Sequence, residues 1–94
     1  MTLMIIHHRV RDYATWRPVF DAHEPARTAA GLSNGRVFRS ADNPNDLILL
    51  FDFADRRKAE EFAASDELKT AMQRAGVEGR PDMHFTEART AAST

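Results

Sequence analysis

The chain has 94 residues, of which 43% are hydrophobic and 29% charged, with a formal net charge of -1 at pH 7. This length suits one domain, and the near-neutral charge provides no broad positive field to attract nucleic acid or an anionic membrane surface. The sequence contains no cysteine, which excludes disulfides, iron–sulfur clusters and thiol nucleophiles, and no run approaches the ~20 apolar residues of a membrane-spanning helix.

Residues 3–10 are predicted to form the first strand, because a run of apolar residues continues into two histidines with strand-like alternation. The two faces of this strand would be made by Met4, Ile6, His8 and Val10 on one side and by Leu3, Ile5, His7 and Arg9 on the other. Since His7 and His8 are adjacent, they point to opposite faces and cannot bind one metal together.

A helical stripe follows, with residues at spacings of three and four. Its members are Tyr13, Trp16, Phe20, His23, Arg27 and Ala30. Asp12 is predicted to be the N-cap, with its carboxylate accepting hydrogen bonds from amides of the first turn. Pro18 and Pro25 each lack an amide proton, so we expect a broken helix in which a short turn leads into a main helix beginning at Pro18.

Gly31 is a plausible helix-terminating residue, and residues 33–35 (Ser-Asn-Gly) are predicted to turn into a second strand at 36–40. Residues 42–46, Asp-Asn-Pro-Asn-Asp, have the strongest turn composition in the chain and would join this strand to a third at 47–53 as a hairpin.

A second helix is predicted from Arg56, capped by Asp55, with a new start at Ser65. The break is expected because Phe62 and Leu68 would lie about 120° apart around a straight helix. Gly76 would end the helix, a connection through residues 79–81 would lead into a last strand at 82–88, and residues 89–94 are predicted to be a disordered tail.

The order βαββαβ predicts one α+β, ferredoxin-like domain over residues 1–88, with two helices on one face of a four-stranded antiparallel sheet. The third strand is apolar on both faces, although the helices would cover only one. We therefore expect a homodimer in which two sheets meet face to face, burying more than about 1,000 Å² in total.

Three residues are candidates for catalysis. His8 and His23 are suited to proton transfer near neutral pH, and Arg39 to stabilising negative charge on an enolate or carboxylate. The candidate ligand-binding residues are Tyr13, Trp16, Phe20, Phe51, Phe62, Met83 and Phe85. Together they would suit a flat organic molecule, although each of them can equally serve as a core contact.

Signatures of metal and cofactor sites are absent from the sequence. It has no glycine-rich phosphate loop, no His-Glu-x-x-His motif and no pair of histidines at helical metal spacing. We therefore expect no metal and no cofactor.

One set of residues recurs in a known family: residues 8–16 (HRVRDYATW), Phe20-Asp21, Arg27, Gly31, Asn43-Pro44-Asn45, Phe62, Ser65, Leu68, Met72, Ala75-Gly76-Val77, Gly79 and Pro81. By these residues the chain resembles, over about residues 3 to 88, the antibiotic-biosynthesis-monooxygenase-like and cyclase-like proteins of the dimeric α+β barrel superfamily. The resemblance implies the barrel fold, the dimer, and chemistry such as cofactor-independent oxygenation or polyketide cyclisation.

Two classes of function remain open. The first is an enzyme that binds a small aromatic or polyketide-like molecule between sheet and helices. The second is a module without catalysis, either a ligand-binding domain or a stress-related dimer with a filled interior. In both cases we expect a cytoplasmic homodimer that binds neither nucleic acid nor membrane.

Overall fold

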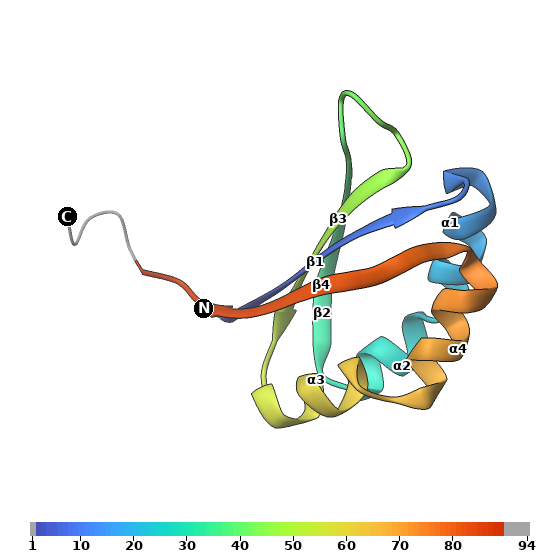
Figure 1. The fold of residues 1–94 in the computed structure, drawn as a ribbon. Coiled ribbons are helices and arrows are strands. Elements are labelled where there is room, and N and C mark those ends of the chain that lie inside the picture. Colours follow the sequence, from blue (N-terminus) through green and yellow to red (C-terminus); the bar gives the residue numbers. More distant parts are fainter. Residues whose placement is uncertain (1, 90–94) are drawn as a thin grey trace.

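The computed structural model describes residues 2–89 and is built from four strands and four helices. In chain order these are β1 (Thr2–Val10), α1 (Tyr13–Ala22), α2 (Glu24–Ala29), β2 (Leu32–Arg39), β3 (Asp46–Phe53), α3 (Arg56–Ala63), α4 (Asp66–Ala75) and β4 (Val77–Glu87). The strands form one antiparallel sheet in the order β2-β3-β1-β4, and the helices cover one of its faces (Figure 1). This confirms the predicted α+β, ferredoxin-like architecture, with each predicted helix divided in two.

The sequence predicted that the domain ends at residue 88 and that residues 89–94 form a disordered tail. Ala88 and Arg89 follow β4 without regular structure, and residues 90–94 lie outside the described residues. Within residues 2–89, every helix is too short or too polar to cross a lipid bilayer.

The first helical segment breaks at His23, so the prediction that the main helix begins at Pro18 is wrong. Pro18 lies inside α1, where Pro18 and Ala14 are both exposed and water can bond the carbonyl left free. Pro25 instead occupies the first turn of α2, where a missing amide proton costs nothing. Asp12 is the N-cap residue, as predicted, but its carboxylate accepts from the Thr15 hydroxyl and not from a backbone amide of the first turn.

The second strand begins at Leu32, four residues before the predicted start, and includes the predicted turn at 33–35. There the register against β3 shifts between Ser33 and Arg36, and Asn34 has a positive φ of 52°, so the segment forms a bulge within the strand. A Cβ on Gly35 would lie 2.9 Å from the Phe51 ring, so glycine permits this ring to approach the bulge.

The last strand begins at Val77 and not at the predicted residue 82, because the segment expected to be a connection pairs with β1. Asp82 pairs with His7 and Glu78 with Arg9, which leaves residues 79–81 opposite His8 alone. Gly79 has a positive φ of 70°, and Pro81 needs no partner for an amide proton. The sheet is therefore irregular next to His8.

The predicted helix boundaries in the second half are confirmed. Asp55 accepts hydrogen bonds from the amides of Arg57 and Lys58, and the Ser65 hydroxyl accepts from Leu68. Gly76 ends α4 with a φ of 81°. The new helix start at Ser65 directs both Phe62 and Leu68 toward the core side.

The core lies between the sheet and the helices. Met4 and Leu47 are fully buried there, and Val10, Trp16 and Phe51 nearly so. The opposite face carries Ile48 and Phe38, which are 44% and 51% exposed and lie side by side on β3 and β2. The sheet thus has a face with exposed apolar side chains that no helix of residues 2–89 covers.

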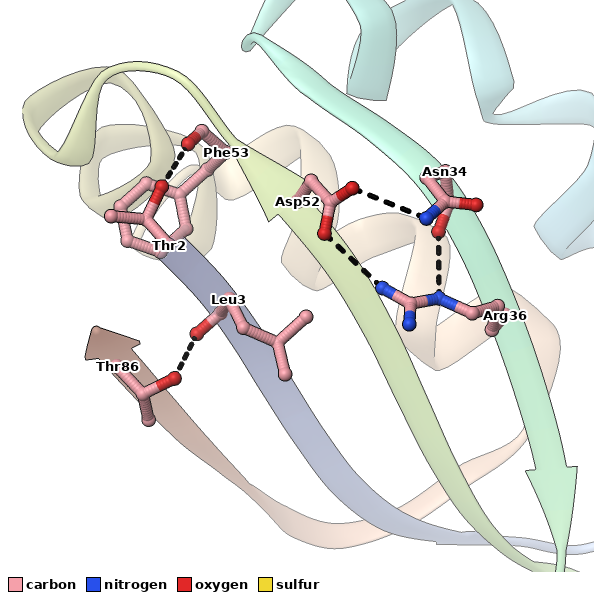
Figure 2. A network of polar contacts seen from close by, with 7 residues as sticks. All are labelled: Thr2, Leu3, Asn34, Arg36, Asp52, Phe53 and Thr86. Atoms are coloured by element: carbon pink, nitrogen blue, oxygen red, sulfur yellow. Dashed lines mark hydrogen bonds and ion pairs between the residues drawn. The ribbon is translucent and has the colours of Figure 1, made fainter. Parts of the chain in front are cut away.

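Polar side-chain contacts join the strands at one end of the sheet (Figure 2). Arg36 and the Asn34 amide both donate to the Asp52 carboxylate, at 3.2 Å each. Thr86 donates to the carbonyl of Leu3 at 2.8 Å, and Thr2 donates to the carbonyl of Phe53. The strands at this end of the sheet are therefore joined by side chains as well as by backbone pairing.

Candidate functional site

A cavity of about 50 Å³ lies between the sheet and the helices. It is lined by Ile6, His8, Trp16, Val19, Phe20, His23, Arg27, Leu49, Phe51, Phe62, Leu68, Ala71, Met72, Ala75 and Met83. Seven of the ten residues predicted for the site lie in this lining: His8, His23, Trp16, Phe20, Phe51, Phe62 and Met83. These seven residues range from β1 to β4, so the fold brings distant parts of the sequence together at the cavity.

His8 is the buried imidazole of the site. It is 6% exposed, and neither ring nitrogen has a hydrogen-bond partner among the described residues. Its place on β1 follows from the strand alternation, which directs His8 inward with Ile6 and Val10 and leaves His7 exposed. His7 instead contacts the Asp46 carboxylate through Nε2 at 2.8 Å.

The environment of His8 favours the neutral imidazole. Burial, with a smaller contribution from neighbouring His7, lowers the pKa of His8 from 6.5 to about 4, and Asp46 opposes this shift. At neutral pH the ring therefore has one N–H donor and one nitrogen lone pair, both directed into protein that offers them no partner. A polar ligand in the cavity could satisfy either.

Aromatic rings of α1 form one wall of the cavity. The Trp16 indole and the His8 ring form a T-shaped pair, with ring centroids 5.8 Å apart and planes at 80°. Phe20, one helical turn later, stacks on Trp16 at 4.6 Å, and Phe51 of β3 lies 6.2 Å from Phe20. Such rings give a flat, apolar surface beside the His8 imidazole.

His23 lies at the junction of α1 and α2, and its side chain is 16% exposed. Its ring is 5.8 Å from that of Phe62, and its Nε2 is 3.5 Å from a carboxylate oxygen of Glu67, an ion pair only when the histidine is protonated. This nitrogen is buried and the geometry gives it no hydrogen bond. The two predicted histidines therefore line one cavity from opposite layers of the fold.

Arg27 of α2 also lines the cavity, although it was not among the predicted site residues. Its guanidinium lies over the Phe20 ring at 3.9 Å and donates to the Phe20 carbonyl at 2.7 Å. Burial lowers the pKa of Arg27 from its usual value, with Glu24 and Asp21 opposing the shift. The signal that could have identified it was its position on the helical stripe, four residues after His23.

Three predicted site residues lie outside the cavity lining. Arg39 is exposed, lies over the Tyr13 ring at 4.0 Å and donates to the Pro44 carbonyl. Tyr13 touches Trp16 from the outer side, with centroids 5.7 Å apart. Phe85 packs edge-on against Phe53 near the far end of the sheet. The structure does not bring Arg39 to the two histidines.

Among the described residues, neither a metal-binding cluster nor an asparagine contributes to this cavity. Within residues 2–89, no cluster of three or more histidine, aspartate or glutamate side chains is arranged to hold a metal ion. The asparagines expected in turns have structural roles: Asn34 lies in the β2 bulge, and Asn45 bonds the first amide of α1.

No family model and no curated protein sequence matches the chain, but solved structures do. A candidate antibiotic biosynthesis monooxygenase from Bordetella bronchiseptica is 16% identical with a TM-score of 0.78, covering 95% of this chain and 97% of that one. A similar candidate from Caulobacter crescentus is 17% identical with a TM-score of 0.72, covering 95% and 90%. SnoaB, a cofactor-independent oxygenase from Streptomyces nogalater, is 17% identical with a TM-score of 0.71, covering 96% and 94%. The chain thus has the fold of the antibiotic biosynthesis monooxygenases, as its sequence predicted.

Proposed function

We propose that the protein binds a small aromatic or polyketide-like molecule in the cavity and that neutral His8 removes a proton from it. Cofactor-independent oxygenation or ring closure of the resulting anion would follow. The observation that carries this proposal is the buried His8 ring, whose two nitrogens have no partner among the described residues. Buried polar groups are almost always hydrogen-bonded, so an exception on a cavity wall is a candidate for ligand contact.

The lowered pKa of His8 fits a base that acts only on a bound ligand. Before a ligand binds, a pKa of about 4 makes the imidazole a weak base that stays neutral. Proton transfer from a phenol or an activated carbon would create an imidazolium next to an anion, and this opposite charge would raise the pKa of His8. The ion pair would form with water excluded by the aromatic rings, where electrostatic stabilisation is strong.

The similar structures support the reaction class without fixing it. SnoaB shares this fold and is a cofactor-independent oxygenase. A cavity with a neutral base and a flat aromatic wall would suffice for the same kind of step.

A homodimer through the open face of the sheet is part of the proposal. Ile48 of β3 and Phe38 of the edge strand β2 are large apolar side chains exposed on that face, and Leu3, Ile5 and Leu50 lie half-buried on the same face. Burying side chains of this kind contributes about 1.5 to 3 kcal/mol each before the cost of association.

We also propose a cytoplasmic location, which cell fractionation would test.

The size of the cavity favours a second candidate, a dimeric module without catalysis. At about 50 Å³ the cavity is much smaller than the about 150 Å³ that accommodates benzene in a protein core. A ring can enter only if half-buried side chains such as Phe20, Phe62 and Met72 move apart. If they do not, the interior is simply a packed core.

An activity screen with one substitution would separate the two candidates. The purified protein would be incubated with hydroxylated naphthalenes and anthrones, with oxygen uptake and product formation followed together. We expect His8→Gln to reduce turnover of any active compound by about 10² to 10⁴, because glutamine cannot take the proton. His84→Gln is the matched control, since His84 is exposed and lies outside the cavity lining; because it pairs with Ile5 on the face proposed for the dimer, its sedimentation is measured alongside its turnover.

The outcomes of this screen are distinct. Turnover in the wild type and in His84→Gln but not in a folded His8→Gln supports the proposal. Turnover that survives His8→Gln removes His8 from the mechanism. Absence of turnover and of binding across the screen favours the module with a filled interior.

A further inference from the structure

We propose that Arg27 binds the carboxylate of an aromatic ligand at the mouth of the cavity, so that the ligand class is an aromatic carboxylate whose ring points toward His8. The inference rests on the proposed function in one respect, since it assumes that the cavity receives a ring. It adds the charge of the ligand and the residue that selects it.

Position is the first argument. Arg27, Phe20 and Phe51 line both the inner cavity and a larger groove of about 440 Å³ on the outer side. The groove is polar as well as apolar, with Asp21, Glu24 and Asn34 among its lining. Arg27 therefore stands where a ligand would pass from solvent to the cavity.

The second argument is that no carboxylate forms a direct ion pair with this charge, although Asp21 and Glu24 lie nearby. Within residues 2–89, Arg27 forms no ion pair with a carboxylate, whereas neighbouring Arg17 is paired with Asp21 at 3.0 Å. Arg27 is nevertheless half-buried. Desolvating a guanidinium without a counter-ion is unfavourable, and a bound anion would remove that cost.

The geometry of the guanidinium is the third argument. Its face lies on the Phe20 ring, and one nitrogen, Nη1, donates to the Phe20 carbonyl. Stacking occupies the face of the guanidinium and leaves its donors free, because its five N–H groups point outward in the plane of the group. Donors on Nε and Nη2 have no hydrogen bond to a described residue and can hold a carboxylate in a two-point contact.

Phe20 connects this contact to the cavity. The same ring that supports Arg27 stacks on Trp16, which touches His8. A ring attached to a carboxylate held by Arg27 would have to displace or slide along Phe20 to reach the cavity. Ligand binding should therefore change the surroundings of Trp16, the single tryptophan of the chain.

The experiment is a titration of the full chain with sodium benzoate and with its neutral counterpart benzamide. Binding is followed by the NMR signal of the Trp16 indole N–H, with sodium chloride added in matched amounts to separate salt effects. The variants are Arg27→Gln, Arg27→Lys and, as a control, Arg57→Gln, whose arginine is 88% exposed on α3 and outside the cavity and the groove. Circular dichroism and thermal melting verify that each variant is folded.

We expect benzoate to bind at least about tenfold more tightly than benzamide to the wild type and to Arg57→Gln. Arg27→Gln should remove this preference, and Arg27→Lys should retain part of it, because lysine keeps the charge but not the two-point contact. Equal affinity for benzoate and benzamide in the wild type, no binding of benzoate, or a preference that survives in folded Arg27→Gln would each overturn the inference.

These results are separable from those that test the proposed function. Benzoate has no proton for His8 to remove, so its binding does not depend on catalysis. An Arg27-dependent preference without turnover of any compound would count against the enzyme alone. Turnover that depends on His8, together with equal affinity for benzoate and benzamide, would count against Arg27 alone.

Discussion

The side-chain oxygen of Asn45 accepts a hydrogen bond from the backbone N–H of Tyr13 at 2.9 Å, across 32 positions of sequence. The backbone carbonyl of Asn45 also accepts from Val10 at 2.8 Å. One residue of the β2–β3 hairpin therefore holds both the end of β1 and the start of α1. These two elements carry His8 and Trp16, so the hairpin fixes the relation between them.

Replacing Asn45 with alanine should destabilise the protein by about 0.5 to 2 kcal/mol, as for other lost helix caps. The loss should appear as a lower midpoint in urea unfolding. Asn45→Asp is the matched variant, because it retains the acceptor oxygen and adds negative charge at a helix N-terminus, where such charge is stabilising. Equal losses in both variants would contradict the capping role.

Gly35 and Phe51 give a second prediction. A Cβ at position 35 would lie 2.9 Å from Cε1 of Phe51, closer than carbon atoms pack, so Gly35→Ala should cost about 1 to 3 kcal/mol through displacement of the ring. The measurement is urea unfolding of Gly35→Ala, Phe51→Leu and the double variant. We expect the cost of Gly35→Ala to fall in the Phe51→Leu background. Additive costs would show that the contact with the ring is not the cause.

Features set by neighbouring residues were predictable from the sequence. Asp55, Ser65 and Gly76 act through bonds or backbone angles within a few positions, and each has its predicted role. The strand alternation likewise gave the inward direction of His8. In such cases local chemistry alone decides the structure.

Features set by distant pairing were not predictable. Asn34-Gly35 and Gly79 have turn composition, but pairing with β3 and β1 incorporates both segments into strands as bulges. Arg39 pairs with buried Leu47, so strand alternation places it on the core face of the sheet. Because Arg39 is the last residue of β2, its side chain contacts Tyr13 and Pro44 and does not line the cavity. Alternation gives the face of a residue, and not its distance from a site along the strand.

The open face gives a third prediction. Ile48→Asp would place a carboxylate opposite Phe38 and His7 within the proposed dimer interface. Burying that charge should cost about 3 kcal/mol or more, weakening the dimer by more than about a hundredfold. Sedimentation velocity should therefore find a dimer for the wild type and a folded monomer for Ile48→Asp. Thr70→Asp, at an exposed position on α4, should remain dimeric; a monomeric wild type would refute the interface.

The buried His8 makes stability depend on pH. Its pKa in the folded protein is about 4, below the usual 6.5, so in this interval the unfolded chain binds more protons than the folded one. Stability must then rise with pH across the interval, with the contribution of His8 complete above about 6.5 and lost as pH falls toward about 4.

This dependence can be isolated with a variant that cannot titrate. Between about pH 7 and about pH 5, the His8 contribution should fall by about 2 kcal/mol, on top of changes from the carboxylates. Urea unfolding of the wild type and of His8→Gln at both pH values cancels those shared changes. On acidification, the unfolding free energy of the wild type should therefore fall by about 2 kcal/mol relative to that of His8→Gln. If the difference in unfolding free energy is the same at both pH values, His8 is hydrated or hydrogen-bonded in solution. The proposal that His8 is a buried neutral base would then be wrong.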